Sequence, residues 1–121
     1  MSVPEIYNFV LYYLSKSDAD KAATRFLRRW HPIVLRSNWS GVHALHVSGS
    51  KRMLKPVIRH IQSEKNKCIV YRVGTFGVPL PREAQQMEAK ASMIVICPNA
   101  TEADARKRFE IRAFLALQAT S

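Results

Sequence analysis

Two short apolar runs, at residues 67–73 and 92–97, constrain the fold more than any other feature of the sequence. They read KCIVYRV and SMIVIC, and both are rich in the β-branched residues that favour strands. The second run is apolar at nearly every position, which is typical of a strand with both faces buried. The chain is therefore expected to build a sheet that helices cover.

The other segments predict a hairpin and a series of helices around these strands. Residues 33–47 predict a β-hairpin that turns at 38–41, where asparagine and glycine suit a turn. Apolar residues at helical spacing predict helices over 4–14, 20–30, about 50–64, 82–90 and 101–118. Pro56 leaves two starts open for the third helix, near residue 50 or near residue 55, and the later start is favoured.

These segments together predict a single domain of the α+β class over residues 1–121. An N-terminal helical hairpin, with a polar turn at 15–20, precedes a roughly four-stranded sheet, and helices cover the sheet up to a C-terminal helix. A chain of 121 residues has an ordinary size for one domain. No repeat, low-complexity tract or long linker divides it.

The charge of the chain is strongly positive and unevenly placed. Nineteen Lys and Arg stand against nine Asp and Glu, for a formal charge of +10. Residues 21–60 contain nine of the basic residues and none of the acidic ones, whereas residues 61–121 are nearly balanced. Such a patterned excess predicts a local surface for a polyanion, which would be RNA, DNA, an anionic membrane or an acidic protein.

The basic residues of this segment form two stripes at helical spacing. Lys21, Arg25, Arg28 and Arg29 lie opposite the apolar face of the helix predicted at 20–30. Arg52, Lys55 and Arg59 do the same on the next predicted helix. Because the core orients each helix, both stripes are expected to face solvent, where Lys and Arg can bind phosphates.

The junction at residues 48–52 is a second candidate for an anion contact. A glycine between two serines precedes a helix N-terminus, where free N–H groups attract anions, and Lys51 and Arg52 would add charge. An ordinary capped turn is the alternative. The predicted contacts to nucleic acid are Lys21, Arg25, Arg28, Arg29, Arg36, Ser50, Lys51, Arg52, Lys55 and Arg59.

Two aromatic residues in predicted loops are candidates for stacking on bases. Trp39 falls in the hairpin turn, and Phe76 falls in the glycine-rich loop at 74–81. Trp39 has an alternative placement, folded back over the core.

No pattern in the sequence predicts an enzyme, a metal site or a cofactor. Cys68 and Cys97 are too far apart for a zinc motif and are expected to be free. His43 and His46 would point to opposite faces of a strand, so they cannot easily share a metal. No catalytic triad, paired-acid motif or nucleotide fingerprint is present.

The sequence also indicates no membrane partner and no secretion. Its apolar runs fall short of the roughly 20 residues that a membrane span requires. The N-terminal segment lacks a basic region and is interrupted by Pro4, Glu5 and Asn8, so it does not resemble a signal peptide. The expected compartment is the cytoplasm or the nucleus.

Residues 6–26 resemble the lissencephaly-homology dimerisation motif. The residues that match its spacing are Tyr13, Leu14, Ala23 and Phe26. Asp18-Ala19 replaces the glycine that the motif has between its helices, and Arg28-Arg29 replaces its acidic residue. The resemblance implies a homodimer through the apolar first helix.

The interpretation that best fits these features is a non-enzymatic nucleic-acid-binding protein. It would bind the sugar-phosphate backbone without sequence specificity, and RNA is favoured over DNA because no DNA-reading motif is present. Such a basic protein would suit a viral accessory protein or a ribonucleoprotein component. Two alternatives are a self-association module that presents a basic face to an acidic partner, and a small enzyme acting on a phosphate-bearing substrate at 48–52.

Overall fold

The computed structural model describes residues 5–27, 32–63, 69–71, 79–97 and 102–119. These residues form five strands: β1 (Tyr7–Tyr13), β2 (Ile33–Trp39), β3 (Val42–Gly49), β4 (Ile69–Tyr71) and β5 (Met93–Cys97). They also form four helices: α1 (Lys16–Leu27), α2 (Lys55–Ser63), α3 (Arg82–Ala89) and α4 (Glu102–Ala119). The fold is therefore of the α+β class, as the sequence predicts.

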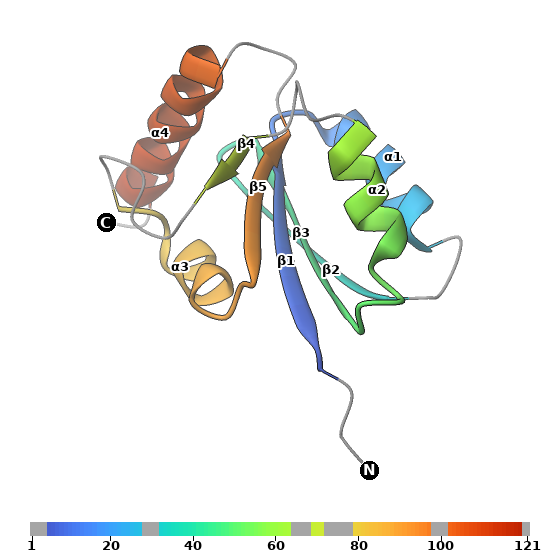
Figure 1. The fold of residues 1–121 in the computed structure, drawn as a ribbon. Coiled ribbons are helices and arrows are strands. Elements are labelled where there is room, and N and C mark those ends of the chain that lie inside the picture. The colour runs from blue at the N-terminus through green and yellow to red at the C-terminus, as the bar shows by residue number, and fades with distance from the viewer. Residues whose placement is uncertain (1–4, 28–31, 64–68, 72–78, 98–101, 120–121) are drawn as a thin grey trace.

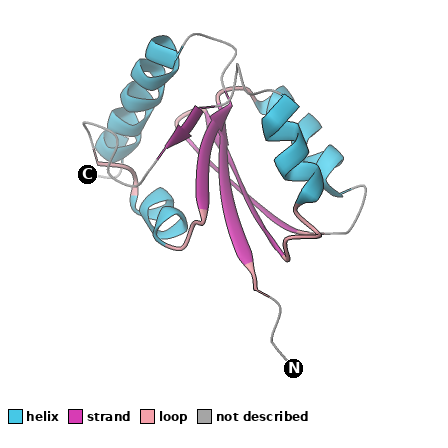
Figure 2. Ribbon diagram, viewed as in Figure 1, coloured by secondary structure: helices cyan, strands magenta, loops and turns pink. Residues whose placement is uncertain are grey.

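The strands form one mixed sheet in the order β2-β3-β1-β5-β4. The central strand β1 pairs antiparallel with β3 and parallel with β5, while β2 and β4 lie at the two edges. Helices α1 and α2 lie on one face of the sheet, and α3 and α4 lie on the other (Figures 1 and 2). The described chain is thus a three-layer arrangement with the sheet in the middle.

Each face of the sheet has its own apolar core, because side chains alternate along a strand. Phe9 and Leu11 of β1 pack with α1 and α2. Val10 and Tyr12 of the same strand pack with α3 and α4. Strand β1 is consequently buried on both sides, and its residues from Phe9 to Tyr13 are at most 5% exposed.

The prediction of a helix at residues 4–14 is wrong, because this segment is the central strand β1. Nearly every position from 9 to 14 is apolar, so the spacing of apolar residues fits a helix and a strand alike and cannot distinguish them. Phenylalanine, valine and tyrosine also favour strands. The polar turn at 15–20 is wrong as well, since α1 begins at Lys16.

Two further predictions depended on a helix at residues 4–14. Without a helical hairpin, the resemblance to the lissencephaly-homology motif has no structural basis. The prediction of a homodimer through the first helix loses its basis too, because this segment is the middle strand β1, whose side chains are covered on both faces.

The remaining predicted elements within the described residues are confirmed. The hairpin of β2 and β3 turns at Ser40 and Gly41, whose φ angles of 46° and 80° suit the tight turns that join twisted strands. Helix α2 begins at Lys55, which places Pro56 in its first turn, as the later start requires. The helix predicted at 20–30 corresponds to α1, and residues 28–31 lie outside the described part.

Candidate nucleic-acid interface

Helices α1 and α2 lie side by side on one face of the sheet (Figure 1). Helix α1 packs through small residues and one aromatic ring: Ala19, Ala22, Ala23 and Phe26. Helix α2 and the turn before it contribute Val57 and Leu54, which are fully buried in the same core. This packing fixes which side of each helix faces outward.

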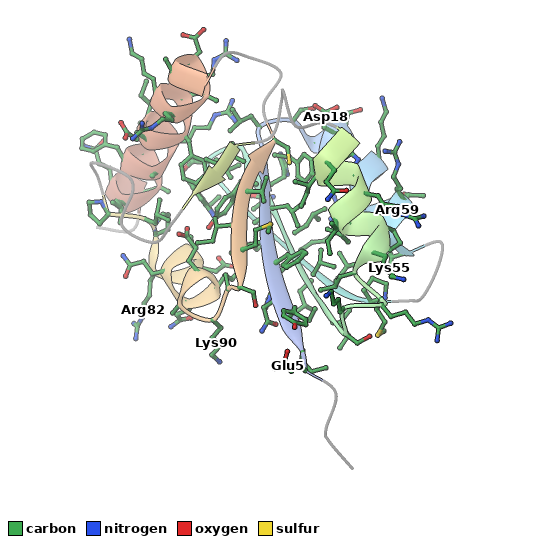
Figure 3. All side chains as sticks on the ribbon, viewed as in Figure 1. Glu5, Asp18, Lys55, Arg59, Arg82 and Lys90 are labelled. Carbon is green, nitrogen blue, oxygen red and sulfur yellow. The ribbon has the colours of Figure 1, made fainter. Side chains whose placement is uncertain are left out.

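The outward sides of the two helices carry the two basic stripes. Lys21 and Arg25 are exposed on α1, and Lys55 and Arg59 are exposed on α2. Lys51 and Arg52 are exposed in the turn that leads into α2. We call these six residues the basic face. Figure 3 shows Lys55 and Arg59 pointing away from the sheet.

A direct contact joins the α1 stripe to the α2 stripe. The Arg25 guanidinium donates a hydrogen bond from Nη1 to Nδ1 of His60, over 2.9 Å. The His60 ring is held edge-on against Phe26 of α1, with ring centroids 5.5 Å apart. His60 follows Arg59 on α2, so this contact places Arg25 next to the α2 stripe. His60 was not predicted as a site residue, because its contact depends on how the two helices pack.

The acidic residues of α1 and α2 are Asp18 and Asp20, and both lie on α1. The sequence of α2, KPVIRHIQS, contains no acidic residue. On α1, Asp20 forms an ion pair with Arg36 of β2, and this hydrogen bond is the main reason that the pKa of Asp20 lies below its usual value. Arg36 therefore lies on the same side of the sheet, but its charge is largely compensated.

The flank of α1 also borders a hollow of about 380 Å³, lined by Asp20, Lys21, Thr24 and Arg25. Two of these four residues belong to the basic face.

The junction at 48–52 does not form an anion cradle. Ser48 donates a hydrogen bond to Oδ1 of Asn8 on β1, over 2.8 Å. Ser50 accepts the backbone N–H of Met53 at 3.4 Å, so its hydroxyl caps the turn before α2. The capped turn is therefore the observed alternative, and the Ser50 hydroxyl serves as its cap. Lys51 and Arg52 remain at the surface of this turn.

The prediction that Trp39 stacks on a base is wrong. Its side chain is only 7% exposed and packs against Tyr12 and Phe109, with ring centroids at 6.0 and 5.3 Å. Trp39 thus takes the alternative placement, over the core. Phe76, Arg28 and Arg29 lie outside the described residues.

The histidines of the hairpin lie apart, as the sequence predicts. His43 pairs in register with Tyr13, and His46 pairs with Val10, so the two rings point to opposite faces of β3. Burial and the charge of Lys90 lower the pKa of His46. Among the residues that the structure describes, no group of three or more His, Cys, Asp or Glu could hold a metal ion.

Comparisons of the chain with protein-family models, with curated proteins and with solved structures found no match. Within the described part of the chain, no helix has both the length and the apolar character needed to cross a bilayer.

Proposed function

We propose that this protein binds nucleic acid through the basic face of α1 and α2, without base-specific contacts and with RNA preferred over DNA. The observation that carries the proposal is the joining of two basic stripes by the contact between Arg25 and His60. Because the stripes are adjacent, one strand of phosphates can contact both helices at once. Each phosphate that Lys or Arg neutralises releases counterions, which gives such a surface its affinity.

The shape of the surface favours the backbone over the bases as the bound feature. Helices α1 and α2 lie together on the sheet, so neither stands out alone as a helix that reads the major groove does (Figure 1). The buried Trp39 offers no stacking platform either. Backbone contacts position a nucleic acid without reading its sequence.

Reversing two charges of the basic face should weaken binding strongly. We expect the double variant Lys55→Glu/Arg59→Glu to bind a single-stranded 20-nucleotide RNA about 10- to 100-fold more weakly, since each 1.4 kcal/mol changes affinity tenfold. The slope of log K against log salt should fall by roughly 1.4, at about 0.7 for each lost phosphate contact on a single strand. Fluorescence anisotropy over a salt series, with duplex DNA and polyglutamate as competitors, measures both quantities.

The matched control is the double variant Arg82→Glu/Lys90→Glu. Both of these residues are exposed on and next to α3, on the other side of the sheet (Figure 3), and the control changes the net charge equally. It should keep most of the affinity. Equal losses in the two double variants would show that net charge, not this surface, governs binding. Displacement of RNA by polyglutamate at lower concentration than by nucleic acid would favour an acidic protein instead.

A further inference from the structure

The outer surface of α4 carries large apolar side chains that the fold does not cover. Ile111, Phe114 and Leu115 are 50%, 49% and 50% exposed, and they follow one another at helical spacing. Lys107 and Arg108 continue the same side of the helix one turn earlier and are also exposed. We call these five residues the outer stripe of α4.

The inner side of α4 shows the reverse distribution of side-chain size. It packs on the sheet through three alanines and one phenylalanine: Ala105, Phe109, Ala113 and Ala116. An amphipathic helix that serves only its own domain places its large apolar residues inward. Helix α4 instead has an apolar side for its own sheet and a second apolar side facing outward, which is the pattern of a contact surface.

From this pattern we infer that a second copy of the chain covers the outer stripe, with the two α4 helices packed antiparallel about a two-fold axis at Ile111. In that register Ile111 meets Ile111 of the other copy, Arg108 lies beside Leu115, and Lys107 lies beside Phe114. A lysine ammonium over an aromatic ring is a favourable cation–π contact, and the stem of an arginine can cover a leucine.

The charges of the stripe favour this antiparallel arrangement. Its cations, Lys107 and Arg108, are confined to its N-terminal end, and its C-terminal end is uncharged. A parallel pair would place Lys107 against Lys107 and Arg108 against Arg108. The antiparallel pair separates these like charges, so the stripe is complementary to itself, as a two-fold interface requires.

The three-layer fold also allows two such basic chains to pair without bringing their basic faces together. The basic face lies on the opposite side of the sheet from α4 (Figures 1 and 3). Two copies joined through α4 would therefore carry their basic faces on the two outer sides, far from each other. A contact limited to one pair of helices is small, so the dimer should be weak and form in the micromolar range.

Sedimentation velocity over a protein concentration series, after nuclease treatment, tests this inference. The chain should shift from the monomer mass towards twice that mass, and added salt should strengthen the dimer by screening repulsion between the two positive copies. Salt would weaken nucleic-acid binding instead, so self-association and the proposed function are read out separately.

Two variants locate the contact. Phe114→Glu should remain monomeric at concentrations where the wild-type chain is a dimer, with circular dichroism confirming that it folds. Leu35→Glu is the control, because Leu35 is 58% exposed on the edge strand β2 and would disrupt pairing of sheet edges only. A wild-type chain that stays monomeric, or a Phe114→Glu variant that still dimerises, would overturn the inference, and so would a dimer lost only in Leu35→Glu.

Discussion

Replacing Phe109 by alanine is expected to lower the free energy of unfolding by about 3–5 kcal/mol. Phe109 is fully buried on the inner side of α4. Its ring lies 4.8 Å from that of Tyr12 on β1 and 5.3 Å from that of Trp39 on β2. These three aromatic rings connect α4 to two strands, so the alanine variant leaves a cavity at the contact between layers. The loss is a large part of the total stability that a small domain has.

The control for this prediction is Phe114→Ala, which changes the same residue type on the same helix. Phe114 is half exposed, so in the monomer its replacement should change stability by only about 0.5 kcal/mol. Urea unfolding followed by tryptophan fluorescence, at protein concentrations too low for dimerisation, compares the two variants. If both lost the same stability, the packing of α4 on the sheet would differ from that described above.

The basic stripes could be predicted from the sequence because each follows from local geometry. On α1 and α2, apolar residues fix the inward side, and the bases between them then face outward. The contact between Arg25 and His60 could not be predicted in this way. These residues are separated by 35 positions in the chain, and only the packing of α1 against α2 brings them together.

The central strand was missed because of how its apolar residues are distributed. A strand buried on both faces has no alternation, and a continuous apolar run fits helical and extended spacing equally well. The run at 92–97 was identified as a strand on its β-branched residues, and the same criterion applied to Phe9, Val10 and Tyr12 would have favoured a strand.

The placement of Trp39 depended on the length of one turn. A turn over 38–41 would have lifted its side chain out of the strand. The observed turn is confined to Ser40 and Gly41, so Trp39 is the last residue of β2 and its side chain points to the core. A shift of this kind changes which face a side chain occupies, because strand residues alternate.

The buried hydrogen-bonded pair of Tyr12 and Glu88 lies on the same side of the sheet as Trp39, and it was not predicted from the sequence either. The helix predicted at 82–90 corresponds to α3, and its Glu88 is only 4% exposed. The Tyr12 hydroxyl, itself fully buried, donates a hydrogen bond of 2.5 Å to Oε2 of Glu88. Burial raises the pKa of Glu88 above its usual value of 4.5, while the hydrogen bond from Tyr12 acts in the opposite direction.

This pair gives stability a defined dependence on pH. The raised pKa means that the folded state holds the Glu88 proton more tightly than the unfolded state does. The contribution to stability is therefore complete below pH 4.5 and is lost as pH rises through the folded pKa. Glu88→Gln cannot titrate, so its stability relative to the wild type should increase with pH over that interval. Urea unfolding of both proteins at a series of pH values gives this difference, and a constant difference would contradict the assignment.

Tyr12→Phe removes the hydrogen-bond donor of the pair. We expect this variant to lose stability relative to the wild type as pH rises, whereas Glu88→Gln should gain it. At neutral pH it removes the donor and leaves a buried carboxylate without the hydrogen bond from Tyr12, which should cost about 1–3 kcal/mol. Below pH 4.5 the carboxyl is protonated and the loss should be smaller. Because the hydrogen bond from Tyr12 lowers the pKa of Glu88, its removal should also extend the decline in stability to higher pH. In a Tyr12→Phe/Glu88→Gln double variant this pH dependence should disappear, whereas its persistence would assign the titration to another carboxyl group.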